Sequence, residues 1–149
     1  MMNLAKSYDL SGVSTTFNFG TITSPFPDLT LVDNSICVGY GLLESSSYHV
    51  NATSAGAGGV VGAPFQMTNG TYKLNYSVSW AGTAGGSPSY VALSSGVNSS
   101  SSFTAQVLGG LTCLLLPANA TMQLKLLNAD QVLAKQGTYT DTLTVLIVS

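Results

Sequence analysis

Hydrophobic and polar residues alternate with a period of two along much of this chain, as is typical of β-strands that bury one face. The clearest run covers residues 71–80, where every second residue from Tyr72 to Trp80 is apolar and the residues between them are polar. Residues 139–148 repeat the pattern, but their second half is apolar at consecutive positions. That second half predicts a central strand, or one covered on both faces.

Shorter and weaker strand patterns fill the rest of the chain and are separated by clusters of Gly, Pro, Ser and Asn. We predict strands over 15–22, 35–40, 48–53, 64–68, 89–93, 102–108 and 121–127. Asn69-Gly70 stands between two apolar runs and is a strong signal for a hairpin turn. Residues 128–137 predict one or two turns of helix, with Asn128 as the N-cap and Gly137 after the end.

Many short strands with frequent turns predict an all-β fold, an antiparallel sandwich or barrel. A length of 149 residues is typical of a single domain.

Charge is scarce in this chain. Four lysines, no arginine and six acidic residues make 7% of the sequence and a net charge of −2, whereas hydrophobic residues make 45%. A cationic surface that would bind nucleic acid is therefore excluded. Because charge keeps free proteins apart, such a chain is expected to be assembled or covered by a partner rather than to live as a lone monomer.

The cysteines are two, Cys37 and Cys113, without the spacing of a metal site. The composition, rich in Ser and Thr and poor in Lys, favours an extracytoplasmic location, where the pair would form a disulfide. Two buried free thiols are the alternative.

No motif for catalysis or cofactor binding is present. His49 is the single histidine, the six carboxylates are scattered, and no phosphate-binding loop or nucleophile elbow occurs. We therefore predict no enzyme activity, no catalytic residue, no metal and no cofactor.

Several segments resemble one known family. Residues 136–145 (QGTYTDTLTV) are similar to the last-strand motif of the spore coat protein U family, which includes archaic chaperone–usher pilins. Residues 17–21 (FNFGT) look like its early FG motif. Residues 35–38 with 48–52 look like its cysteine-bearing strand and the following one, and 74–80 (LNYSVSW) resembles a strand of fimbrial major subunits.

The resemblance implies an immunoglobulin-like antiparallel β-sandwich that lacks one strand and is completed by a donor strand from another subunit. On this interpretation residues 1–16 form an N-terminal extension that serves as the donor strand, and residues 17–149 form the pilin-like domain. The candidate donor side chains are Leu4, Tyr8 and Leu10. The candidate side chains of the acceptor groove, in the final strand, are Tyr139, Leu143, Val145 and Ile147.

The function implied by the resemblance is that of a structural subunit of an extracellular adhesive pilus. Its partners would be identical subunits in the filament, a periplasmic chaperone and an outer-membrane usher during assembly, and a host or abiotic surface. The location would be a cell-surface filament reached through the periplasm.

Two alternatives stay open at this point. One is a self-complete β-sandwich that binds a surface or carbohydrate through aromatic side chains such as Phe26, Trp80, Tyr90 and Phe103, although the alternation places Trp80 in a core. The other is a coat or shell protein that assembles into closed particles.

Overall fold

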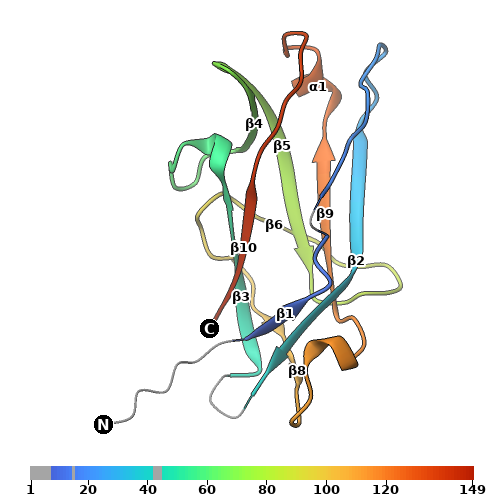
Figure 1. The fold of residues 1–149 in the computed structure, drawn as a ribbon, viewed down its shortest axis with the longest axis vertical. Helices are drawn as coiled ribbons and strands as arrows, with labels where there is room; N and C mark the ends of the chain where they lie inside the picture. Colours follow the sequence, from blue (N-terminus) through green and yellow to red (C-terminus); the bar gives the residue numbers. More distant parts are fainter. Residues whose placement is uncertain (1–7, 15, 42–44) are drawn as a thin grey trace.

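Two antiparallel β-sheets face each other in a computed structural model that describes residues 8–14, 16–41 and 45–149 (Figure 1). The strands are β1 (Asp9–Ser11), β2 (Leu29–Tyr40), β3 (Ser47–Ser54), β4 (Phe65–Asn69), β5 (Tyr72–Ala81), β6 (Val91–Ala92), β7 (Phe103–Thr104), β8 (Gln106–Val107), β9 (Ala120–Leu126) and β10 (Leu143–Val148). The helical turns are η1 (Ala55–Ala57), η2 (Cys113–Leu115) and α1 (Asn128–Gln131). The all-β prediction is confirmed.

The larger sheet has the order β1-β2-β9-β5-β4 within the described residues, with β6 beside β5 and β8 beside β2. The smaller sheet has the order β10-β3-β7. Between β1 and β2, residues 12–14 and 16–28 run along the front of the molecule from β1 to the end that carries α1 (Figure 1). These residues and β10 therefore lie at the same open side of the sandwich.

The core lies between the two sheets and is built from the alternating residues of β5 and their counterparts. Trp80 of β5 and Tyr48 of β3 are both fully buried. The Trp80 indole N–H donates to the Tyr48 hydroxyl at 3.1 Å, so the two polar atoms satisfy each other across the sandwich. Burial raises the pKa of Tyr48 to about 12.

The predicted disulfide between Cys37 and Cys113 is confirmed. It attaches η2 to β2. The Cys113 backbone N–H also donates to the Asp9 carboxylate at 2.7 Å, which connects η2 to β1. The disulfide and this hydrogen bond together connect β1, β2 and η2 at the end of the molecule opposite α1 (Figure 1).

The segment that follows β1 is held tightly on β2. Asp33 accepts hydrogen bonds from the Ser14 N–H at 2.7 Å and from the Ser35 N–H at 3.0 Å. Burial by itself raises the pKa of Asp33, but hydrogen bonds from Ser35 and Ser14 outweigh it and bring the pKa below its ordinary value. Gly12 passes so close to the Ser35 carbonyl that a Cβ there would collide with it.

Most of the strands predicted from alternation occur, and so does the hairpin between β4 and β5. Its turn is made by Gly70, with φ of 60°, and Thr71, because Asn69 pairs with Tyr72. β2 begins at Leu29, six residues before the predicted start at residue 35.

Three expectations are wrong. Residues 16–22 form no strand, because no neighbouring strand pairs with them in the described chain. The final strand is at a sheet edge rather than central, with β3 as its partner and Leu146 53% exposed. The helix has the predicted single turn, but its N-cap is Leu127 and Asn128 is its first helical residue. Its side chain instead donates to the carbonyls of Pro25 and Phe26.

Candidate strand-binding groove

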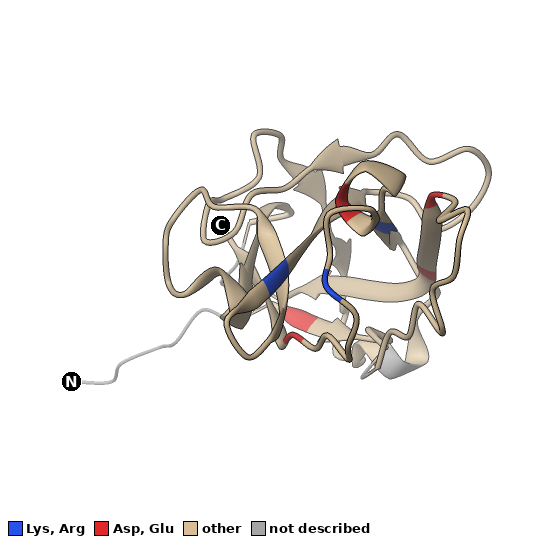
Figure 2. Cartoon of the chain, turned by 90° about the horizontal axis from the view of Figure 1, so that it is seen from above, with Lys and Arg blue, Asp and Glu red and all other residues tan. Residues whose placement is uncertain are grey.

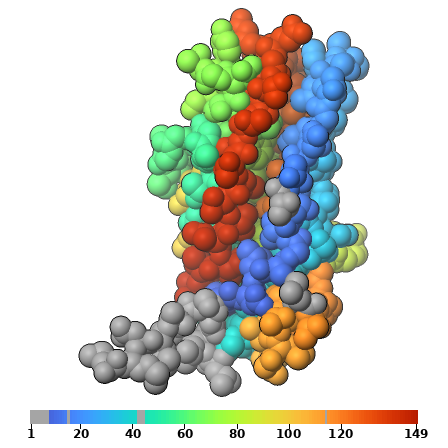
Figure 3. Space-filling model, viewed as in Figure 1, coloured from blue at the N-terminus to red at the C-terminus, as the bar shows by residue number. Residues whose placement is uncertain are grey.

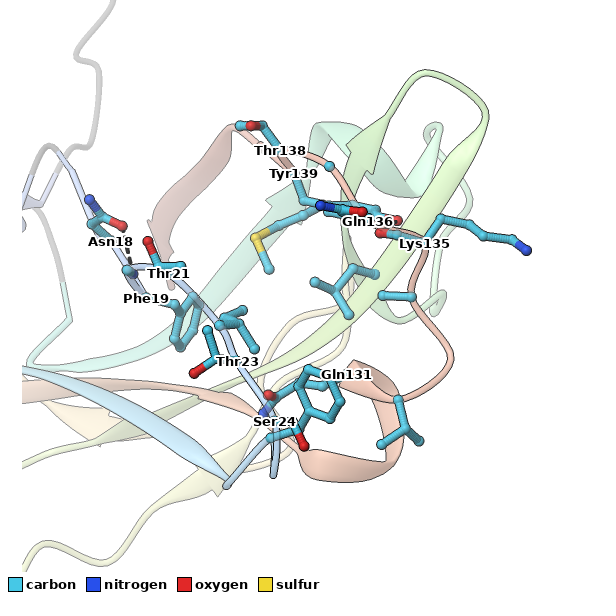
Figure 4. A pocket seen from close by; sticks show the side chains of 18 of the residues that line it. Asn18, Phe19, Thr21, Thr23, Ser24, Gln131, Lys135, Gln136, Thr138 and Tyr139 are labelled. Carbon is cyan, nitrogen blue, oxygen red and sulfur yellow. Dashed lines mark hydrogen bonds between the residues drawn. The ribbon is translucent and has the colours of Figure 1, made fainter.

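An apolar groove opens between residues 17–26 and the segment that leads into β10. In space-filling view the two segments run side by side along the long axis (Figure 3). The groove contains a cavity of about 870 Å³ at the end near α1. Met67 and Leu74 contribute to its lining from the β4–β5 hairpin, and Phe19 and Tyr139 from its two sides (Figure 4).

Beyond this cavity, the segment that holds Tyr139 continues into an unpaired strand edge, β10. β10 pairs with β3 in the register that sets Val145 opposite Ala52. The Ala55 N–H donates to the Thr142 carbonyl at 3.0 Å, so antiparallel alternation directs the backbone groups of Thr144 and Leu146 toward β3. The N–H and C=O groups of Leu143, Val145 and Ile147 therefore point away from β3, and they have no hydrogen-bond partner among the described residues.

The opposite wall is formed by residues 16–24, an extended segment whose backbone groups also have no partner strand among the described residues. Phe17, Phe19 and Ile22 are half-buried and pack against the core, whereas Asn18, Gly20 and Thr21 are exposed. The backbone bonds found over residues 16–24 are local: Gly20 N–H to its neighbour Asn18 Oδ1 at 2.7 Å, and Phe26 N–H to the Thr23 carbonyl at 3.0 Å. Two lines of unpaired backbone groups thus border one apolar floor, which is the environment that an added β-strand needs.

The other side of the smaller sheet is closed. Residues 95–99 lie along β3 and replace a strand: the Gly96 N–H donates to Ala52 O and the Ser99 N–H to Val50 O, both at 2.8 Å. The hydroxyls of Ser95 and Ser99 accept the N–H groups of Ser54 and Val50 at 2.9 and 3.0 Å. The lack of partners is therefore confined to the β10 side of this sheet within the described chain.

A half-buried carboxylate, that of Asp141, fixes the place where the last strand begins. Asp141 Oδ2 accepts hydrogen bonds from the hydroxyls of Ser54 and Tyr76, the latter at 2.6 Å, and Oδ1 accepts the Gly56 N–H at 2.7 Å. Burial raises the pKa of Tyr76 far above its ordinary value, and the bond to Asp141 adds to that rise. Thr140 also exchanges two backbone bonds with Thr68 of β4, at 2.8 and 3.0 Å. These contacts attach the start of the last strand to β3, β4 and β5.

The predicted acceptor residues lie together on this wall. Tyr139 lines the cavity, and its hydroxyl donates to the Lys135 carbonyl at 2.8 Å. Leu143, Val145 and Ile147 follow on β10, half-buried against the core. Their role as an acceptor stays a prediction, since the single chain holds no second strand.

The predicted donor residues lie elsewhere. Leu4 is outside the described residues. Tyr8 and Leu10 pack against this chain's own core, and the Tyr8 hydroxyl donates to the carbonyls of Ser45 and Ser47, both at 2.9 Å. In this structure both side chains are therefore used by their own subunit, and their transfer to another subunit stays a prediction.

Sequence reasoning missed two parts of the site. Phe17 and Phe19 form the second wall, whereas the sequence predicted for them a strand and a family-like motif but no place in the groove; the alternation in Phe17-Asn18-Phe19 is the signal that indicates their inward direction. Asp141 is one of the six scattered carboxylates in the sequence. No local pattern marks it, because its partners lie in two distant segments, Ser54 and Gly56 in one and Tyr76 in the other.

Aromatic side chains do not form a platform for sugar stacking around Trp80, which is fully buried. Phe103 packs on Tyr48 at 5.6 Å between ring centroids, and Phe26 lines the groove. The charged residues are dispersed over the ribbon (Figure 2). No helix of the described chain is long and apolar enough to span a membrane.

Comparison with known proteins yields one informative likeness. No family model matches the sequence, and neither does any curated protein. Among solved structures, the chain resembles one from a chaperone–tip adhesin complex that serves in CFA/I fimbriae biogenesis, with a TM-score of 0.62 and 12% identity. The match covers 95% of this chain and 42% of that one, so this chain spans less than half of its neighbour's length. The likeness shows the fold, and the resemblance to the spore coat protein U family stays a prediction.

Proposed function

We propose that this chain is a non-catalytic structural subunit of a cell-surface pilus, and that its groove accepts one extended strand from another subunit. The observation that carries the proposal is the unpaired edge of β10 beside the apolar groove. Exposed backbone groups on a sheet edge are a template for strand addition, and a second strand between β10 and residues 16–24 would satisfy both walls at once.

The fold likeness to a chain of a fimbrial chaperone–adhesin complex supports the same interpretation. In the cell such an edge needs protection before assembly. A periplasmic chaperone that fills the groove until the next subunit arrives, and an outer-membrane usher that orders the exchange, would provide it. The low charge of the chain fits a surface that meets identical neighbours.

The decisive experiment removes one hydrogen-bond donor from the groove. The Val145 N–H points away from β3 and has no partner in the described chain, so Val145→Pro deletes a group that the fold does not use. Proline is tolerated on the free side of an edge strand, whereas an incoming strand loses a ladder bond and meets the ring.

We expect the unmodified chain, purified from the periplasm, to form fibres or oligomers in negative-stain micrographs and size-exclusion chromatography. Val145→Pro is expected to stay monomeric with an unchanged far-ultraviolet circular dichroism spectrum. Val145→Ala, which trims the side chain but keeps the N–H, is the matched control and should still assemble. A stable monomer of the unmodified chain, or full assembly of Val145→Pro, would contradict the proposal.

A further inference from the structure

The two ends of the molecule carry apolar side chains that the core does not use. At the α1 end, Leu127, Val132 and Leu133 are 41%, 53% and 82% exposed. At the opposite end, Val107 of β8, Leu111 and Leu115 of η2 are 60%, 48% and 71% exposed (Figure 1). We call these the α1 patch and the η2 patch. Elongated subunits with apolar patches at opposite ends are suited to head-to-tail contact.

We propose that the α1 patch of one subunit binds the η2 patch of the next copy in the filament. This inference rests on the proposed function, because strand exchange decides which ends meet. β10 runs from the α1 end to the η2 end, so a strand that pairs antiparallel with it leaves the groove at the α1 end (Figure 1).

The body of the donating subunit begins at that point. Its first described strand, β1, lies at the η2 end and is attached to η2 through Asp9 and Cys113. An N-terminal donor strand that leaves the groove of one subunit at the α1 end therefore brings the η2 end of the next subunit against it. A donor strand parallel to β10 would set two η2 ends against each other, which closes a symmetric pair and stops growth.

The size of the patches explains why the contact needs the strand. Three partly exposed aliphatic side chains offer roughly 200–300 Å² at each end, well below the roughly 800 Å² per partner of a stable interface. The contact is too small to join free monomers. Once a donor strand tethers two subunits, the local concentration is in the millimolar range and a small patch suffices.

Cysteine cross-linking of assembled fibres tests the contact. In the full chain, Leu133→Cys and Leu115→Cys are combined, and fibres are oxidised and separated on a non-reducing gel. We expect a ladder of covalent oligomers, because each subunit contributes one cysteine to each of two neighbours. Each single substitution should give monomers alone. The native disulfide is buried and does not compete.

The matched control pairs Leu133→Cys with Val61→Cys. Val61 is 71% exposed, as Leu115 is, but lies in the side loop after η1. Fibres that form without a ladder, or a ladder from the control pair, would overturn the end-to-end contact and leave strand exchange standing. Absence of fibres from the unmodified chain would overturn both.

Discussion

The two sides of the smaller sheet differ in whether their outward backbone groups have hydrogen-bond partners. On the β3 side, the hydroxyl oxygens of Ser95 and Ser99 accept the N–H groups of Ser54 and Val50. Backbone N–H groups of residues 95–99 donate to the carbonyls of Val50 and Ala52. On the β10 side, the outward backbone groups of Leu143, Val145 and Ile147 have no partner among the described residues. Residues 95–99 show how this chain can satisfy a sheet edge with side-chain hydroxyls, and no such hydroxyls face β10 among the described residues, which agrees with the proposed addition of a strand there.

The largest difference in unfolding free energy is expected between two proline substitutions at adjacent positions of β10. Thr144→Pro removes an N–H that faces β3 and should cost about 3 kcal/mol or more of unfolding free energy. Val145→Pro removes an N–H that faces the groove and should cost well under half as much. Urea unfolding of monomeric protein measures both. Equal losses would mean that the two sides of β10 do not differ.

The next prediction concerns the clamp, by which we mean the hydrogen bonds of the Asp141 carboxylate with Ser54, Gly56 and Tyr76. Asp141→Ala leaves the hydroxyls of Ser54 and Tyr76 and the Gly56 N–H without their acceptor. Loss of a half-buried carboxylate with three donors should cost about 2–4 kcal/mol. Tyr76→Phe removes one of the three donors and should cost less. If Asp141→Ala unfolds at the same urea concentration as the unmodified chain, the clamp contributes nothing to the position of β10.

The covered edge has its own test. Ser99→Ala removes the acceptor of the buried Val50 N–H and should cost about 1–3 kcal/mol. Ser100→Ala, at an exposed neighbouring position, is the control and should change the midpoint of thermal unfolding by a degree or less. Oligomer formation through the β3 edge by Ser99→Ala would show that the hydroxyl also protects that edge.

Alkaline pH tests the core that lies between the two sheets. Burial raises the pKa of Tyr48 from 10.0 to about 12, so the folded state holds that proton more tightly than the unfolded state. The stabilisation is complete below pH 10 and is lost as the pH rises toward 12, at about 1.4 kcal/mol per pH unit.

Denaturation at several pH values between 9 and 12 measures this slope. Tyr48→Phe should lower the slope, whatever constant loss follows from the unpaired Trp80 N–H. The lysines titrate in both proteins and cancel in the comparison. Identical slopes would mean that Tyr48 is as accessible to hydroxide in the folded chain as in the unfolded one.

Periodicity predicted the strands that bury one face, since alternation records which side chains meet the core. β5 and the β4–β5 hairpin follow from Tyr72–Ala81 and Asn69-Gly70 in this way. The same signal failed in the predicted strand over 15–22, whose described residues, 16–22, alternate without forming a strand. Their side chains pack inward as the pattern requires, but a strand also needs a backbone partner, and the chain supplies none there.

By itself the sequence determined an all-β, nearly uncharged chain with a buried alternating core and two cysteines able to pair. Only the tertiary structure decided that β10 has a free edge among the described residues, that Tyr8 and Leu10 pack against this chain's own core, and that Asp141 accepts hydrogen bonds from Ser54, Gly56 and Tyr76. The physical reason is the range of the interactions. Side-chain burial leaves a local period of two, whereas backbone pairing and carboxylate contacts depend on segments tens of residues away.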